Sequence, residues 1–172
     1  MDEDLERLAS QVGRALQHRG LMLVTAESCT GGWIAQAVTA TEGSSQWFER
    51  GFVTYTNIAK QEMLGVRSDT LQRYGAVSEP TVCEMAGGAL QHSHAQISVA
   101  VSGIAGPGGA TTDKPVGTMC LAWARRDGRH VSHGDAVTRS RTLHFPGDRA
   151  AVRRAAVLAA LRGVLEIIQD IN

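Results

Sequence analysis

The side chains best suited to covalent chemistry stand together in one short segment, Ser28-Cys29-Thr30-Gly31-Gly32. The apolar run Leu21–Val24 precedes this segment with the length of a strand, and apolar residues recur behind it at helical spacing. Those positions are Trp33, Ile34, Ala37, Val38 and Thr41. A hydroxyl or thiol between a strand and a helix lies near backbone N–H groups that lack a partner inside the helix and attract negative charge. The segment therefore predicts a nucleophile beside an oxyanion site, with Ser28 as the first candidate and Cys29 as its rival.

A structural interpretation of the same residues stays open. Serine and threonine are common helix N-caps, and glycine is common where a chain turns tightly. The spacing also differs from the G-x-S-x-G pattern of the best-known nucleophile turn. The residues alone thus leave two roles for this segment, a reactive centre and a helix cap.

A second glycine-rich segment, Ser102-Gly103-Ile104-Ala105-Gly106-Pro107-Gly108-Gly109, leaves the compact apolar strand Ile97–Val101. Loops at the carboxyl ends of strands bind ligands in open α/β sheets, and successive N–H groups in such a loop can hold an anion. The segment is not a P-loop, because no Gly-Lys-Ser/Thr ending follows. It is a poor dinucleotide fingerprint, because Lys114-Pro115-Val116 leads into another strand rather than a helix. Ligand contact and a structural loop are both compatible with it.

A base must activate a serine hydroxyl before it can attack. Lys60 is the candidate, because it follows Tyr55 and Asn57 at the start of a predicted short helix, where burial would lower its pKa. A solvent-facing lysine is the alternative. The histidines are His18, His92, His94, His130, His133 and His144, and none has a recognisable catalytic setting. The pairs 92/94 and 130/133 have metal-like spacing without a third ligand, so neither a metal nor a cofactor is expected.

Composition bounds the class of protein. The 172 residues suit one domain over residues 1–172, and the 17 Lys and Arg balance the 17 Asp and Glu, so nucleic-acid binding is not expected. No apolar run approaches the roughly 20 residues of a membrane span, and the acidic N-terminus lacks secretion-signal features. We therefore expect a cytoplasmic protein without a membrane partner. Cys29, Cys83 and Cys120 form neither a disulfide framework nor a zinc pattern, and the last two fit a core.

The order of the elements predicts an α/β fold, a layered mixed β-sheet flanked by helices. The expected helices cover residues 3–19, 33–41, 57–64, 69–73, 78–90 and 148–168, and the expected strands lie in 21–24, 47–55, 97–101, 116–124 and 130–145. Gly20 and Gly65 end two of the helices, Ser78 and Asp148 begin two others, and Asp127-Gly128 is a hairpin signal.

Five motifs occur in one order and together resemble a known family. They are Thr25-Ala26-Glu27-Ser28-Cys29-Thr30-Gly31-Gly32, Val53-Thr54-Tyr55-x-Asn57-x-x-Lys60, Gly75-Ala76-Val77-Ser78, Ser102-Gly103-Ile104-Ala105-Gly106-Pro107-Gly108-Gly109 and Lys114-Pro115-Val116-Gly117-Thr118. The set resembles the CinA C-terminal domain family, also called the nicotinamide-nucleotide amidase or PncC family, over roughly Leu5 to Ile168. Some members carry an additional N-terminal domain that resembles molybdopterin-binding proteins, and this chain resembles the stand-alone form. Ser102 stands where many members have threonine, so the hydroxyl is kept.

The resemblance implies a metal-free hydrolase that converts nicotinamide mononucleotide into nicotinate mononucleotide and ammonia. Ser28 would be the nucleophile and Lys60 its base, with Tyr55 supporting the pair. The residues that would hold the oxyanion and the nucleotide are Cys29, Thr30, Gly31, Gly32, Asn57, Ser102, Gly103, Ala105, Gly106, Gly108 and Gly109. The resemblance also implies a homo-oligomer, a dimer or higher. The substrate phosphate needs a cation or an N–H-rich loop, and Arg141 and Arg149 are the candidates, with a surface role as the alternative for each.

Two other classes of function remain open at this point. A non-catalytic nucleotide-binding module of the competence or DNA-damage type would use the same glycine segments, with Lys60 contacting a phosphate. A purely structural oligomer would show no effect of the ligand on the melting temperature.

Overall fold

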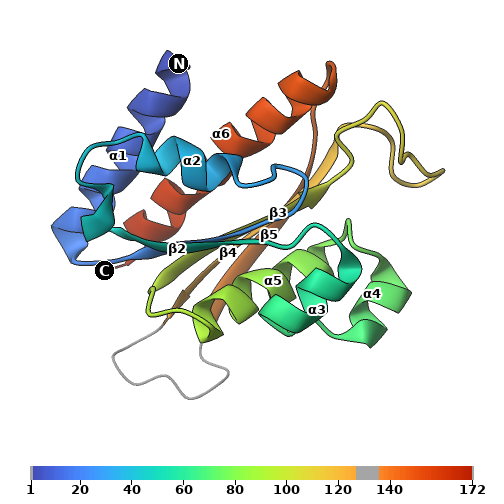
Figure 1. Ribbon diagram of the computed structural model, residues 1–172, viewed down its shortest axis with the longest axis horizontal. Helices are drawn as coiled ribbons and strands as arrows, with labels where there is room; N and C mark the ends of the chain where they lie inside the picture. The colour runs from blue at the N-terminus through green and yellow to red at the C-terminus, as the bar shows by residue number, and fades with distance from the viewer. Residues whose placement is uncertain (1, 127–135, 172) are drawn as a thin grey trace.

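A computed structural model describes residues 2–126 and 136–171 of the chain, and within them five strands form one mixed sheet (Figure 1). The strands are β1 (Leu23–Glu27), β2 (Phe48–Val53), β3 (Ile97–Gly103), β4 (Thr118–Arg126) and β5 (Ala136–His144). The helices are α1 (Glu3–Arg19), α2 (Trp33–Thr39), α3 (Asn57–Leu64), α4 (Ser68–Tyr74), α5 (Glu79–Gln91) and α6 (Arg149–Gln169), with a 3-10 turn, η1, at Ser44–Gln46. The predicted fold class is confirmed.

The sheet has the order β2-β1-β3-β4-β5. β1 pairs in parallel with both β2 and β3, whereas β4 and β5 add antiparallel at the far side. Three strands therefore end at the same edge of the sheet, with Glu27 aligned to Val53 on one side and to Val101 on the other. We call this edge, where β1, β2 and β3 end, the carboxyl edge.

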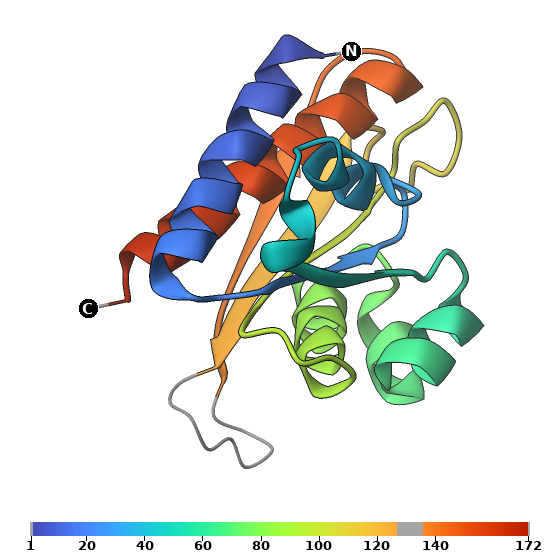
Figure 2. The ribbon, with the colours of Figure 1, turned by 60° about the vertical axis from the view of Figure 1, so that its left-hand side comes forward.

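Helices cover both faces of the sheet (Figures 1 and 2). On one face α1, α2 and α6 enclose a core that includes Val12, Trp47 and Leu161. On the other face α3, α4 and α5 enclose a second core that includes Leu64, Met85 and Ala100. Since successive residues of a strand point to opposite faces, β1 serves both cores, and all five of its residues are buried.

α1 and α6 lie side by side and run in the same direction, as Figure 2 shows. Asp2, which caps α1, pairs with Arg154 near the start of α6, and Arg19 at the end of α1 donates to the carbonyl of Ile171. These contacts hold α6 alongside α1, with the start of α6 close to α2. None of the helices in the described part of the chain combines the length and apolar character that crossing a bilayer requires.

The predicted caps are confirmed, and one strand lies further along the chain than expected. Gly20 and Gly65 end α1 and α3 in the left-handed conformation, while Ser78 and Asp148 accept N–H groups of the first turns of α5 and α6. The strand expected at residues 21–24 is β1, which continues to Glu27 because it pairs on both sides up to that residue. The hairpin signal at residues 127–128 lies outside the described residues.

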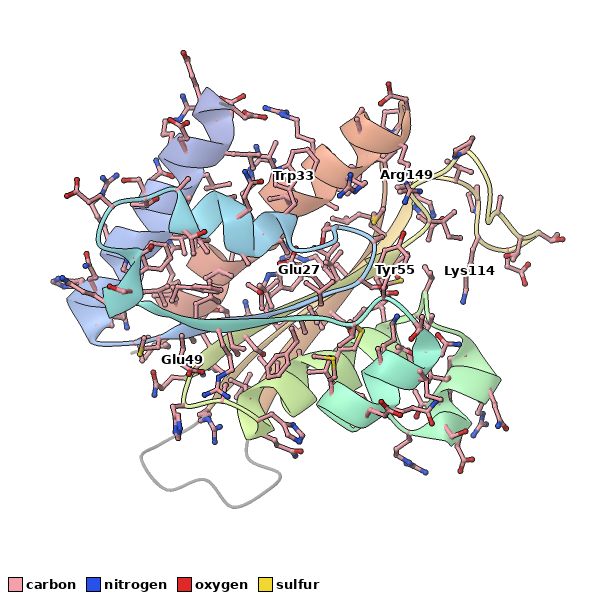
Figure 3. The ribbon with its side chains drawn as sticks, in the orientation of Figure 1. Glu27, Trp33, Glu49, Tyr55, Lys114 and Arg149 are labelled. Carbon is pink, nitrogen blue, oxygen red and sulfur yellow. The ribbon has the colours of Figure 1, made fainter. Side chains whose placement is uncertain are left out.

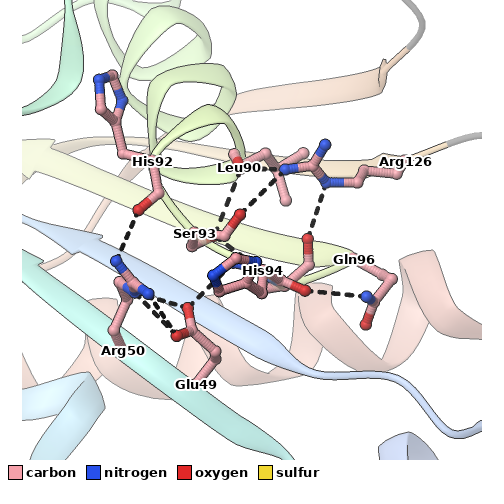
Figure 4. Close-up of polar contacts among 9 residues, drawn as sticks. Glu49, Arg50, Leu90, His92, Ser93, His94, Gln96 and Arg126 are labelled. Atoms are coloured by element: carbon pink, nitrogen blue, oxygen red, sulfur yellow. Dashed lines mark hydrogen bonds and ion pairs between the residues drawn. The ribbon is translucent and has the colours of Figure 1, made fainter. Parts of the chain in front are cut away.

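The sheet edge opposite the carboxyl edge is held by two arginines (Figure 4). Arg50 donates to the carbonyl of His92, 2.9 Å away, just after α5. Arg126 donates to the carbonyls of Ala95, at 2.9 Å, and Ser93, at 3.2 Å. Cations at this end of α5 meet the negative end of the helix dipole, so both contacts stabilise the junction between α5 and β3.

Gly88 lets α5 pack directly against the end of α3, the helix that carries Lys60. A Cβ atom at residue 88 would lie 1.9 Å from the carbonyl oxygen of Leu64. We expect Gly88→Ala to lower the free energy of unfolding by about 1–3 kcal/mol, because backbone must move to admit the methyl group. Thermal unfolding measures this loss.

The matched control is the neighbouring glycine of the same helix. A Cβ at Gly87 meets nothing within 4 Å, so Gly87→Ala should gain up to about 1 kcal/mol of helix propensity. Equal melting temperatures for the two variants would contradict the close contact between α5 and α3.

Candidate active site

The side chains of Ser28 and Lys60 meet at the carboxyl edge. Lys60 Nζ lies 3.0 Å from Ser28 Oγ, although the two residues are 32 positions apart. Ser28 directly follows β1 and continues its ladder, since its N–H donates to the carbonyl of Val101 at 3.1 Å. Lys60 reaches the edge from α3, and three residues separate the end of β2 from the start of α3. Parallel strands that end side by side thus bring the predicted pair together.

Ser28 faces α3 because successive residues along a strand point to opposite faces of the sheet. The side chain of Glu27 turns toward α2, where its carboxylate accepts the N–H groups of Ile34 at 2.8 Å and Ala35 at 3.0 Å. The next residue, Ser28, therefore turns to the other face, toward α3 and Lys60. Figure 3 shows Glu27 below Trp33 of α2, with the side chains of Tyr55 and Arg149 toward the carboxyl edge.

Lys60 is almost completely enclosed, with 1% of its surface exposed. Besides the serine, its amine donates to the carbonyl oxygens of Thr54, at 3.0 Å, and Tyr55, at 3.4 Å. No carboxylate among the described residues lies within ion-pair distance of it. Desolvation lowers the pKa of Lys60, because burial penalises the ammonium without a compensating anion. An amine in this setting can lose its proton more easily than a surface lysine.

The geometry of the neutral amine suits proton transfer. Two carbonyls can take the two N–H groups of a neutral lysine, which leaves the nitrogen lone pair toward the hydroxyl of Ser28. The hydroxyl would then donate across the same 3.0 Å contact, a distance within the range in which a base removes a proton. The serine is 7% exposed, so its oxygen lies at the margin of the buried region.

The helix N-terminus predicted to face Ser28 is occupied by another group. α2 begins only at Trp33, and Glu27 takes the N–H groups of its first turn and also accepts the hydroxyl of Thr30 at 2.7 Å. The expectation that α2 supplies oxyanion donors is therefore wrong. Over residues 28–33, within the described part of the chain, the N–H groups of Ser28, Gly31 and Trp33 donate to carbonyl groups. Those of Cys29, Thr30 and Gly32 donate to no backbone carbonyl there.

Cys29, the rival nucleophile, is buried and lies with its Sγ 3.5 Å from Met119 Sδ. Burial raises the pKa of this thiol to about 11, so the thiol keeps its proton at neutral pH. A protonated thiol is a weak nucleophile. The geometry and the protonation state both favour the serine over its neighbour.

Comparison with known proteins places this geometry in a family. A family model described as the CinA C-terminal domain matches residues 5–168. The chain belongs to the CinA C-terminal domain family. The nicotinamide-nucleotide amidohydrolase PncC of Escherichia coli strain K12 is 53% identical over 161 residues, which cover 94% of this chain and 93% of that protein.

Solved structures of the CinA family have the same fold. The competence damage-inducible protein A (ComA) from Klebsiella pneumoniae subsp. pneumoniae MGH 78578 superposes with a TM-score of 0.89 at 38% identity, covering 98% of this chain and 99% of that one. The competence/damage inducible protein CihA from Agrobacterium tumefaciens has a TM-score of 0.86 at 45% identity, covering 97% and 96%.

The glycine-rich segment of this CinA domain begins inside a strand. Ser102 and Gly103 belong to β3, paired with Cys120 and Met119, rather than to the loop expected from the sequence. Gly103 has no room for a side chain, because a Cβ there would lie 2.1 Å from Met119 Sδ. Ala105 is buried, whereas Gly108 and Gly109 lie in the exposed part of the loop. The structure thus brings the start of the segment beside Ser28 and leaves its end in solvent.

Arg149 and Tyr55 meet over the same edge (Figure 3). Arg149 donates to the carbonyl of Gly106 at 2.8 Å and to the hydroxyl of Tyr55 at 3.1 Å. Tyr55 is 58% exposed, and it contacts Lys60 through its backbone carbonyl, whereas its hydroxyl accepts from Arg149. Asn57, the first residue of α3, is exposed at the same edge.

Arg141 does not join this group. It lies on β5, three strands away from β1, and its guanidinium pairs with Glu166 at 2.6 Å and lies over the ring of Trp123. The sequence could not show which of the two arginines lies at the site, because Arg141 comes shortly before the last helix and Arg149 begins it. Its role as a phosphate ligand is not supported.

Of the two histidine pairs with metal-like spacing, the described residues include only His92 and His94. His92 and His94 lie at the edge opposite Ser28 (Figure 4). His92 Nδ1 is 2.8 Å from the carbonyl of Gly88, and the His94 N–H donates to the Glu49 carboxylate. His130 and His133 lie outside the described residues. In the described ranges, no group of three or more histidine, cysteine or carboxylate side chains gathers as metal ligands would.

Two residues near Ser28 escaped the sequence analysis. Glu27 appears in the first motif without an assigned role, although a carboxylate next to a buried run is a signal of a helix-capping role. Arg153 donates to the carbonyls of Cys29 and Thr30, each at 3.0 Å. No local pattern links position 153 to the turn, since more than 120 residues separate them.

Proposed function

We propose that this chain is an amidohydrolase that hydrolyses nicotinamide mononucleotide to nicotinate mononucleotide and ammonia, with Ser28 as nucleophile and Lys60 as base. The observation that carries the proposal is the 3.0 Å contact between Lys60 Nζ and Ser28 Oγ, with no described carboxylate within ion-pair distance of that amine. The similarity to PncC of E. coli, whose name states a nicotinamide-nucleotide amidohydrolase, supports the substrate class.

The reaction begins with Lys60 neutral. The amine takes the proton of the Ser28 hydroxyl while Oγ bonds to the carboxamide carbon, and the amide oxygen becomes an oxyanion. The N–H groups of Cys29 and Thr30 are the donors that would stabilise this charge. The tetrahedral intermediate then collapses, the C–N bond breaks, and the Lys60 ammonium returns its proton to the departing nitrogen, which leaves as ammonia.

The second half of the reaction reverses these roles. Water attacks the acyl ester on Ser28, Lys60 takes a proton from that water, and the ester bond breaks. Ser28 regains its proton from Lys60, and the product leaves as the carboxylic acid, which then loses its proton to solvent and becomes the carboxylate. One lysine therefore serves as base and acid in both halves, and the one proton released in forming the carboxylate passes to solvent.

Arg149 is the proposed phosphate ligand at the rim of the site. Its guanidinium already bridges Gly106 and Tyr55, so it lies between the glycine-rich segment and the β2–α3 loop. We expect Arg149→Gln to raise KM for nicotinamide mononucleotide about 10- to 100-fold with little change in kcat, because a charge-assisted hydrogen bond is lost. Steady-state ammonia release measures both constants.

Nicotinamide riboside, which lacks the phosphate, is the matched control for that variant. Its weaker turnover should be nearly the same in the wild type and Arg149→Gln. An equal loss for both substrates would assign Arg149 to a role other than phosphate binding.

The function is tested by incubating the purified chain with nicotinamide mononucleotide, with and without a chelator, and measuring ammonia and nicotinate mononucleotide. Equal amounts of both products, unaffected by the chelator, are the expected result. Tight binding without product would instead favour the non-catalytic nucleotide-binding module.

The homo-oligomer and the cytoplasmic location implied by the sequence stay predictions. Size-exclusion chromatography with light scattering tests the homo-oligomer.

A further inference from the structure

Arg153 on α6 holds two successive carbonyl groups of the turn that follows Ser28. Its Nε donates to the carbonyl of Cys29 and its Nη2 to the carbonyl of Thr30, each at 3.0 Å. The guanidinium also lies over the ring of Trp33, 5.4 Å from the centroid, which limits its movement. A planar fork with two donors matched to two carbonyls fixes the orientation of both peptide groups.

The orientation of these carbonyls determines where the neighbouring N–H groups point. A peptide unit is planar and trans, so the carbonyl of Cys29 and the N–H of Thr30 lie in one plane and point in opposite directions. Because that carbonyl points to α6, the Thr30 N–H points away from α6. α3 and Lys60 lie on the other face of the sheet from α6 (Figure 1), so this N–H faces the side from which the base approaches.

The charge of Arg153 adds to this geometric effect. Within the described residues no carboxylate lies at ion-pair distance from it, so its positive charge is not neutralised at the turn. A cation that donates to a carbonyl polarises the whole peptide unit and strengthens its N–H as a donor. Arg153 therefore acts on the N–H of Thr30 through the peptide itself.

Glu27 holds the turn from its other end. Its carboxylate accepts the Thr30 hydroxyl and the first N–H groups of α2, so the turn is fixed between an anion in β1 and a cation in α6. Gly31 has a φ of +62°, the left-handed conformation that favours glycine, and a Cβ there would meet Arg153 Nη2 at an ordinary contact distance of 3.5 Å. Glu27 thus accepts a hydrogen bond from a donor of the turn, and Arg153 donates to two of its carbonyls.

We propose that Arg153 is a positioning residue of the reaction, which aims and strengthens the Thr30 N–H that stabilises the oxyanion. This inference rests on the proposed function, because it needs the oxyanion of an acyl transfer to Ser28. It assigns Arg153 no contact with the substrate. Its loss should therefore affect the transition state more than binding of the nucleotide.

The test compares Arg153→Gln, Arg153→Lys and Arg154→Gln in the full chain. Arg153→Gln should lower kcat about 100-fold with KM nearly unchanged, since a misplaced oxyanion donor costs about this much. Arg153→Lys keeps the charge but not the fork, so it should recover part of kcat. Arg154→Gln is the matched control, because among the described residues Arg154 pairs with Asp2, the cap of α1, and with Asp4 on α1, and it should keep the wild-type kcat.

Labelling of Ser28 by a fluorophosphonate, followed by mass spectrometry, supplies a readout that needs no nucleotide. The labelling rate should fall in Arg153→Gln in parallel with kcat, because the phosphonyl oxygen uses the same donors. A wild type that labels but releases no ammonia would refute the proposed function, while the labelling rates still decide the role of Arg153.

Three results would overturn the inference. They are a wild-type kcat and labelling rate in folded Arg153→Gln, a change confined to KM, and an Arg153→Lys variant no more active than Arg153→Gln. If Arg153→Gln fails to fold, Arg153→Lys decides, and wild-type kcat and labelling in that variant would refute the role of the guanidinium fork.

Discussion

Ser28→Ala is expected to abolish ammonia release from nicotinamide mononucleotide, with a loss of roughly 10⁴-fold or more in kcat, because the covalent route has no other nucleophile. The substitution removes one oxygen at a site that is 7% exposed and leaves the Lys60 amine bonded to the carbonyls of Thr54 and Tyr55. The fold should therefore survive. Ammonia release and thermal unfolding, measured on the same preparation, separate loss of chemistry from loss of structure.

Ser68→Ala, at the exposed start of α4, is the matched control and should retain full activity. Rapid quenching of the wild type followed by mass spectrometry should find the acyl group on Ser28. Turnover that persists in Ser28→Ala but disappears in Cys29→Ala would transfer the nucleophile to the thiol. The raised pKa of Cys29 argues against that result.

Lys60→Met is expected to lower kcat/KM by about 10²–10⁴-fold, the usual contribution of a general base. Methionine keeps an unbranched chain of similar length but cannot accept a proton. In the wild type, kcat/KM should rise with pH, because protonated Lys60 cannot act as a base and the neutral amine can. The midpoint should lie below 10.5, the ordinary pKa of lysine, since burial lowers the pKa of Lys60.

The pH profile distinguishes this role from a phosphate contact. A lysine that bound the phosphate would act as an ammonium, so activity would fall as the pH rose through its pKa. Lys114→Met, which changes the other lysine of the chain, should keep the rising limb, because Lys114 Nζ donates to the carbonyl of Tyr74, whereas Lys60 is the lysine bonded to Ser28. The same pH profile in Lys60→Met and the wild type would exclude Lys60 as the titrating base.

The fold and the reacting pair could be predicted from the sequence because both depend on patterns of neighbouring residues. Apolar periodicity and caps such as Gly20, Ser78 and Asp148 are properties of neighbouring residues, and they place most helices and strands correctly. Parallel strands that end together also make it reasonable that Ser28 and Lys60 meet. The family resemblance reached the same pair through its motifs, which are again short segments.

Tertiary structure alone decided how the pair is surrounded. β1 continues to Glu27 because strands pair with it on both sides, and this turns the carboxylate to α2 and removes the helix donors expected at Ser28. Burial of Lys60 and the position of Arg153 result from packing between segments far apart in the chain. Short motifs specify which groups are present near an edge, whereas solvent exclusion and the direction of each N–H depend on contacts that no local pattern contains.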